Sequence, residues 1–299
     1  MNYRWGLIVL MEINRRQFIA ATASALLFGP APVFAQGKSQ KLLSCRTNKS
    51  GEHFISIVDS NGKLGLSIPI PARGHGIALN SNQDMAAVFA RRPGEFVWVI
   101  NLVTQKVMAK VSPKSGRHYY GHGLFTKDGE RLLCSENAFE TGEGVIGIYD
   151  VRNNFARIGE IQSHGVGPHE FKLLSDNKTL VVANGGICTH PDLPRVKSNL
   201  DTMRPNLAYV SIDSGNLLHK HEPKNKWHQL SIRHIDISAN DQVAIAMQFE
   251  GKPFLQPPLI AIQKGEQPIR FLNAPIQVQS QMRNYCGSVA FNTDGTKFA

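Results

Sequence analysis

The sequence predicts an all-β fold made of a repeated unit of short strands. Two distant segments, YYGHGLFTKDGERLL at residues 119–133 and YCGSVAFNTDGTKFA at residues 285–299, share a Tyr, a Gly, a Phe and an Asp-Gly turn at matching positions. Looser copies begin at Arg73, Gly167 and Ile232. The spacings between aligned positions are 47, 47, 65 and 54 residues. Units of this length, built from short strands, are typical of the blades of a β-propeller.

The first 35 residues predict an export signal. Residues 14–19, NRRQFI, resemble a twin-arginine motif; an apolar run over residues 19–28 follows, and a cleavage site fits after Ala35. Because this run is too short to cross a bilayer, we expect a periplasmic protein with no membrane span after signal removal, in which residues 36–299 form the propeller domain. The segment before Met11 reads as an upstream extension, since MEINRRQF is itself a plausible start.

The strand pattern begins at Lys41. β-rich segments separated by turn sequences are expected at residues 42–47, 53–59, 63–70, 75–79, 85–90, 96–102 and 106–111. No window from here to the end has the capped 3.6-residue periodicity that a parallel β/α fold requires. The first three strands await a fourth, so we expect an open sheet edge there.

Six blades are begun if the fragment at Ser288 is counted, and we expect seven in a complete ring. The chain stops at Phe298-Ala299 inside a strand pattern, which predicts a truncation in the last blade. The fourth unit carries an insertion at residues 185–205 that contains three prolines. Such a long loop is usually either functional or disordered. Because its glycine pair and prolines favour a fixed shape, we expect it to be ordered and to cover one end of the propeller.

Composition excludes several function classes. The net charge is +10, or +8 without residues 1–35, and the basic residues are scattered through turns, which argues against nucleic-acid binding. The chain has no GxSxG, HExxH, P-loop or helix-opening GxGxxG motif.

The chain has four cysteines, Cys45, Cys134, Cys188 and Cys286. They lack zinc-finger spacing, and their spacing leaves all three possible disulfide pairings open. Cys134 lies in a strand pattern and reads as a small buried side chain.

Two segments resemble an uncharacterised family of twin-arginine-exported bacterial β-propellers: VIGIYDVRNNFARIGEIQSHGVGPHEFKLL and TLVVANGGICTHPDLPRVKSNLDTMRPNLAYVSID. The resemblance extends from the signal to Ala299. Members of that family are commonly encoded beside imelysin-type iron-uptake proteins and di-haem peroxidases. The resemblance therefore implies periplasmic iron-uptake or haem proteins as partners. We expect the protein itself to be a monomer.

One histidine aligns in each of four units, and these four are the candidate site: His75, His122, His169 and His234. The first strand of a propeller blade lies nearest the axis, so residues entering these strands should form a ring at the channel mouth. Neutral imidazoles are general ligands for zinc, copper, iron and nickel. The expected cofactor is iron, which the family resemblance implies, or copper. Further candidate ligand-binding residues are Glu170, His190 and Asp192, and Asp236 could supply another carboxylate.

The alternative is structural, because a device repeated in every blade is typical of a fold element. In that reading each ring donates an N–H to a carbonyl of the neighbouring blade. Two function classes follow. The first is an exported binding or scaffold protein serving metal acquisition or redox traffic, with no catalytic residues. The second is a metal-dependent oxidoreductase or hydrolase with its site at the hub.

Overall fold

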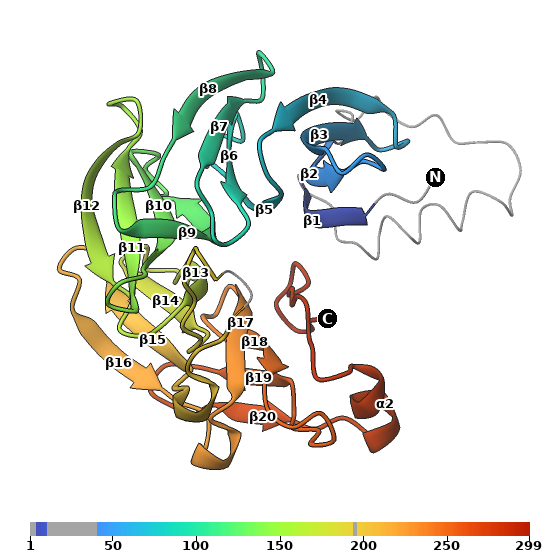
Figure 1. Ribbon diagram of the computed structural model, residues 1–299, viewed down its shortest axis with the longest axis vertical. Helices are drawn as coiled ribbons and strands as arrows, with labels where there is room; N and C mark the ends of the chain where they lie inside the picture. Colours follow the sequence, from blue (N-terminus) through green and yellow to red (C-terminus); the bar gives the residue numbers. More distant parts are fainter. Residues whose placement is uncertain (1–3, 11–40, 194–195) are drawn as a thin grey trace, which may run out of the picture.

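The protein is an open arc of antiparallel sheets around one axis (Figure 1). The structure is a computed structural model that describes residues 4–10, 41–193 and 196–299. Within these residues five four-stranded sheets follow one another along the chain, and every strand pair is antiparallel. The all-β, propeller-like prediction is therefore confirmed.

The sheets are consecutive in sequence, and each contains four successive strands. The first contains β1 (Arg4–Leu10), β2 (Lys41–Thr47), β3 (His53–Asp59) and β4 (Leu64–Ile70). The second contains β5 (Gly74–Leu79), β6 (Met85–Ala90), β7 (Val97–Asn101) and β8 (Lys106–Val111). The third contains β9 (Arg117–Phe125), β10 (Arg131–Ala138), β11 (Glu143–Asp150) and β12 (Ala156–Gln162).

The last two sheets follow the same order. The fourth contains β13 (Pro168–Leu173), β14 (Thr179–Asn184), β15 (Asn206–Ser211) and β16 (Leu217–His221). The fifth contains β17 (Leu230–Ile237), β18 (Val243–Phe249), β19 (Ile260–Gln263) and β20 (Arg270–Leu272). The helical segments among the described residues are short: 3-10 turns at Leu200–Thr202 and Asn225–Trp227, and α2 (Ile276–Gln281). None of these has the length and apolar character needed to cross a membrane.

The first strand of each of the last four sheets lies on the inner side of the arc. β5 contacts β9, β9 contacts β13 and β13 contacts β17, so successive sheets meet through these strands (Figure 1). The apolar core fills the spaces between neighbouring sheets, as where Leu133 and Ile146 of the third sheet pack with Phe171 and Leu180 of the fourth. Strands such as β14 are consequently buried on both faces, which explains their continuous apolar runs.

The expected open edge of the first sheet is wrong for this structure. β1 pairs along β2, from Arg4 opposite Thr47 to Leu10 opposite Leu42, and completes four strands. An apolar segment rich in β-forming residues satisfies the hydrogen-bonding groups that the β2 edge would otherwise leave unpaired. β1 lies within the predicted signal segment, whereas the twin-arginine motif, apolar run and cleavage site lie outside the described residues.

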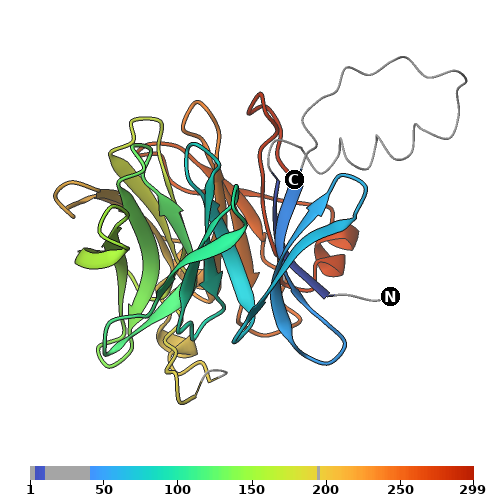
Figure 2. The same cartoon turned by 90° about the horizontal axis from the view of Figure 1, so that it is seen from above.

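The predicted sixth unit begins after α2. Val289 packs on Ala244 and Ala246 of β18, and the backbone N–H of Phe291 donates to Asp236 Oδ2 of β17 at 2.7 Å. A short hairpin joins Ala290 to Ala299 through paired backbone hydrogen bonds. In both views the C-terminal segment lies in the gap between the first and last sheets (Figures 1 and 2).

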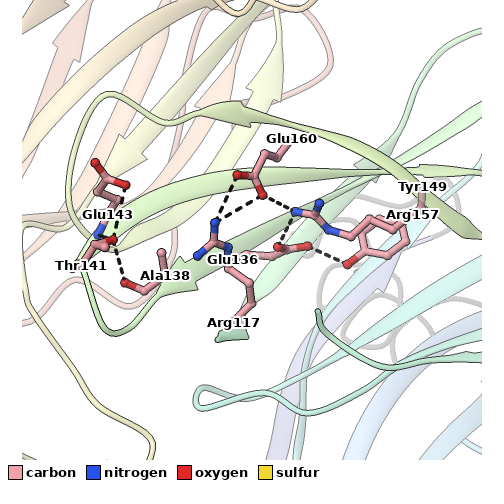
Figure 3. Close-up of polar contacts among 8 residues, drawn as sticks. All are labelled: Arg117, Glu136, Ala138, Thr141, Glu143, Tyr149, Arg157 and Glu160. Atoms are coloured by element: carbon pink, nitrogen blue, oxygen red, sulfur yellow. Dashed lines mark hydrogen bonds and ion pairs between the residues drawn. The ribbon is translucent and has the colours of Figure 1, made fainter. Parts of the chain in front are cut away.

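A buried ionic network ties together the strands of the third sheet (Figure 3). Glu136 is fully buried, accepts a 2.6 Å hydrogen bond from the Tyr149 hydroxyl and pairs with Arg157 Nη2 at 3.0 Å. Arg157 also pairs with Glu160, which is bound from its other side by Arg117. The carboxylate fits because position 147 is glycine: a Cβ there would lie 1.9 Å from Glu136 Oε1.

Candidate metal centre

The four aligned histidines converge on the inner side of the arc. His75 lies on β5, His122 on β9, His169 on β13 and His234 on β17. The ring centroids of successive histidines are 4.7, 4.9 and 4.6 Å apart, and those of the outermost pair, His75 and His234, are 6.4 Å apart. One nitrogen from each of the first three rings lies within 4.8 Å of the others. The repeat register therefore predicted correctly which side chains meet.

Glycines allow the rings to come this close. A Cβ at Gly76 would lie 2.4 Å from the Gly121 carbonyl oxygen and 3.2 Å from His122 Nδ1. A Cβ at Gly121 would lie 2.7 Å from His75, and Gly121 also has a φ of +103°, which other residues rarely adopt. Gly123, next to His122, leaves room for Phe89 and the Leu133 carbonyl oxygen and not for another ring.

Burial keeps at least three of the rings neutral. His122 and His169 are 5% and 6% exposed. Burial lowers the pKa of His122 to about 4, although the Glu170 carboxylate opposes the shift. Burial, reinforced by the neighbouring imidazoles, holds the pKa values of His75 and His169 well below their usual range. The neutral imidazole is the form that binds metal ions, because protonation removes the ligating lone pair.

Two buried ring nitrogens have no hydrogen-bond partner in the described part of the chain: His122 Nε2 and His169 Nδ1. A buried polar atom without a partner costs about 1 to 3 kcal/mol, so it calls for an explanation. The structural alternative predicted rings that donate to carbonyls of neighbouring blades. No backbone carbonyl among the described residues accepts a hydrogen bond from any of the four rings. These unpaired nitrogens are instead suitable metal ligands.

Glu170 orients the fourth ring. Its Oε2 lies 3.1 Å from His234 Nδ1 and also accepts the backbone N–H of Ile235 at 3.0 Å, whereas its Oε1 lies 3.8 Å from His122 Nδ1. Although burial opposes ionisation, the His234 hydrogen bond and nearby cationic groups hold the pKa of Glu170 well below its usual range. A carboxylate that holds one ring nitrogen leaves the other directed for coordination, as in carboxylate–histidine–metal triads.

Lys172 extends this polar chain, and sequence reasoning missed it. Its Nζ donates to Asp236 Oδ1 at 2.6 Å, and the carboxylates of Glu170 and Asp236 raise the pKa of Lys172 against the opposing effect of burial. Glu170 and Lys172 lie two residues apart on β13, and strand alternation places them on one face. Asp236 therefore supports the site by forming an ion pair with Lys172. Its other carboxylate oxygen accepts the backbone N–H of Phe291.

The inserted loop, residues 185–205, lies at the histidine end of the arc. β13 and β14 pair antiparallel with Pro168 opposite Asn184, so the loop leaves the sheet beside His169. Tyr120 donates from its hydroxyl to the Ile187 carbonyl at 3.1 Å, and Asn137 donates to the Thr189 carbonyl at 3.1 Å. In Figure 2 the loop projects beyond one end of the strands. The predicted position is confirmed for the described part of the loop.

The remaining candidates lie apart from the ring. His190 and Asp192 face each other at 3.6 Å within the loop, and His190 packs on Phe139. No contact among the described residues joins either of them to the four histidines. Ser288, which takes the aligned position in the last unit, is exposed. His118, a histidine outside the ring, is 2% exposed and its Nε2 lies 3.1 Å from the Asn137 side-chain nitrogen, because β9 already begins at Arg117.

Fold and site together define an all-β, propeller-like repeat protein with a ring of histidines on its inner strands. The chain belongs to the family described as "Protein of unknown function (DUF1513)", whose model matches residues 68–299. No curated protein matches it.

The four cysteines are free thiols, with Cys45 and Cys134 buried.

Proposed function

We propose that this protein is a metal-binding propeller that holds one transition-metal ion on the four inner histidines. One observation carries the proposal: the rings of His75, His122, His169 and His234 meet. Two of their buried nitrogens, His122 Nε2 and His169 Nδ1, lack hydrogen-bond partners among the described residues. All four candidate ligands are imidazole rings, which bind iron, copper, zinc and nickel better than calcium or magnesium. A bound ion would accept the lone pairs of His122 Nε2 and His169 Nδ1.

We further propose that the protein works in the periplasm, in iron acquisition or redox traffic. The twin-arginine-like NRRQFI segment and the resemblance to exported propellers support this location. The twin-arginine route exports proteins that are already folded. This would suit a metal site whose ligands come from four separate blades and therefore meet only in the folded protein. The ion would then be iron or copper, and the partners would be periplasmic iron-uptake or haem proteins.

Metal titration tests the proposal. Protein freed of metal by a chelator is titrated with iron(II), copper(II) and zinc(II), and binding is followed by calorimetry and elemental analysis. We expect one ion per chain. The His122→Ala and His169→Ala variants should lose affinity by roughly a hundredfold or more, since removing even an outer-shell partner costs about 10- to 100-fold.

The matched control is His228→Ala, because His228 is a half-buried turn residue, outside the ring, whose Nδ1 lies 3.2 Å from the Asn225 carbonyl oxygen. It should bind the ion like the parent. Glu170→Gln should weaken binding by about 10- to 100-fold through the orientation of His234. A parent protein that binds none of the three ions, or ring variants that bind as the parent does, would overturn the proposal.

A further inference from the structure

A basic pocket lies beside the histidine ring. Its volume is about 450 Å³, and its lining includes Arg91, Arg92, Lys197, Arg233, Thr189 and Gln248. None of the described residues that line it is acidic. A pocket of this size accommodates a small organic molecule. Four cationic side chains converging on one concave surface favour an anionic occupant.

These cations come from three separate parts of the chain. Arg91 and Arg92 follow β6, Arg233 lies on β17, and Lys197 lies in the inserted loop. The loop must therefore take up its folded position for the pocket to exist. A long ordered loop is expected to have a functional role. Here the loop contributes Lys197 to a pocket whose arginines come from the sheets.

Arg233 is the central group. It is 9% exposed, and its Nε is buried with no hydrogen-bond partner among the described residues. Its Nη2 lies 3.3 Å from Glu250 Oε1, and Glu250 also binds Lys197. The single carboxylate of Glu250 therefore forms ion pairs with two of the four cationic side chains, Arg233 and Lys197. A planar guanidinium with an unused N–H is suited to bidentate binding of a carboxylate or phosphate.

The pocket adjoins the ring without including it. A second, much smaller cavity is lined by Arg92 and Arg233 together with His169, Gly185 and Ile187. The two arginines are thus shared between the pocket and the space next to His169.

We propose that this pocket is an anion site that binds a small organic molecule with two or more carboxylate or phosphate groups. Several oxyanion groups are needed because the cations are distributed around the pocket. The site is distinct from the proposed metal centre and needs no metal to form, since none of its basic residues belongs to the histidine ring.

Calorimetric titration of the metal-free full chain with citrate and with inorganic pyrophosphate tests the proposal. We expect saturable one-to-one binding of at least one probe, weakening as salt is raised. Arg92→Gln should weaken it roughly ten- to a hundredfold, as loss of one charge-assisted hydrogen bond does. Arg233→Lys keeps the charge opposite Glu250 but removes the planar fork, so it should weaken binding while leaving the melting temperature close to that of the parent.

Arg270→Gln is the control, because Arg270 is exposed on β20 and does not line the pocket. It should bind the probe with the parent's affinity, and so should His122→Ala, which separates this site from the metal centre. Binding of citrate alone would assign a carboxylate ligand, and binding of pyrophosphate alone a phosphate ligand. Absence of binding for both probes, or an equal loss in Arg92→Gln and Arg270→Gln, would overturn the proposal.

Discussion

At the scale of single residues, Glu136 shows how a buried charge is accommodated between strands. It accepts the Tyr149 hydroxyl and pairs with Arg157 inside the third sheet, and Gly147 provides the space (Figure 3). Replacing such a group by an apolar one takes an acceptor from Tyr149 and one of two carboxylates from Arg157, which is more costly than losing the network as a whole. The network therefore specifies how β10, β11 and β12 fit together.

Glu136→Ala should lower the free energy of unfolding by about 1 to 3 kcal/mol, because the buried Tyr149 hydroxyl would lose an acceptor and the half-buried Arg157 would keep only its pairing with Glu160. Urea unfolding measures this change. Glu143→Ala is the matched control, since Glu143 is exposed in the same sheet and its carboxylate accepts a local hydrogen bond from Thr141. Its effect should stay within about 0.5 kcal/mol. Similar losses in the two variants would show that the buried network adds nothing.

At the scale of elements, the first sheet and the inserted loop depend on contacts that local sequence does not define. β1 comes from a segment far from β2 in sequence and still completes the sheet. The loop is held by side chains of other units, such as Tyr120 and Asn137. Both elements show why edges and insertions are less predictable than central strands: their partners are distant in sequence.

The export hypothesis makes a definite prediction for β1. If the signal is cleaved after Ala35, protein recovered from the periplasm begins at Gln36 and lacks Arg4–Leu10, so the β2 edge loses its partner. Mass spectrometry of the recovered protein measures its first residue. Replacing Arg15 and Arg16 with lysines should abolish export while leaving expression unchanged. Recovery of an uncleaved chain that retains β1 would contradict the signal assignment.

At the scale of the whole molecule, the histidine ring joins four sheets, so its ionisation affects the entire fold. Burial lowers the pKa of His122 to about 4, from an ordinary value of 6.5. Between these values the unfolded chain binds more protons than the folded one, and stability therefore falls as the pH falls. The low pKa of Glu170 acts in the same direction at more acidic pH.

Metal-free protein should lose about 3 kcal/mol of stability through His122 alone as the pH falls from 6.5 to 4, at about 1.4 kcal/mol per pKa unit. Urea unfolding across this range measures the slope. His122→Asn should have a shallower slope, because it removes one group that must ionise on unfolding. His228→Asn, in a turn outside the ring, should keep the parent's slope. Equal slopes in all three proteins would contradict the assignment of His122 as a buried neutral ring.

The sequence by itself determined the strands, the turns and the register of the histidines. Strand alternation and Asp-Gly or Asn-rich turns are local properties, and β2 to β8 lie within two residues of their expected bounds. The repeat placed His75, His122, His169 and His234 at equivalent positions, so their convergence followed once the units were stacked around an axis.

Only the tertiary structure decided how close these groups lie and what surrounds them. The contact of Glu170 with His234, the closing of the first sheet by β1, and the convergence of Arg92, Lys197 and Arg233 join residues from separate units. Local patterns specify which face of a strand a side chain occupies. Distances between side chains of different blades depend instead on the curvature of the arc and the packing between sheets, and no short stretch of sequence encodes these.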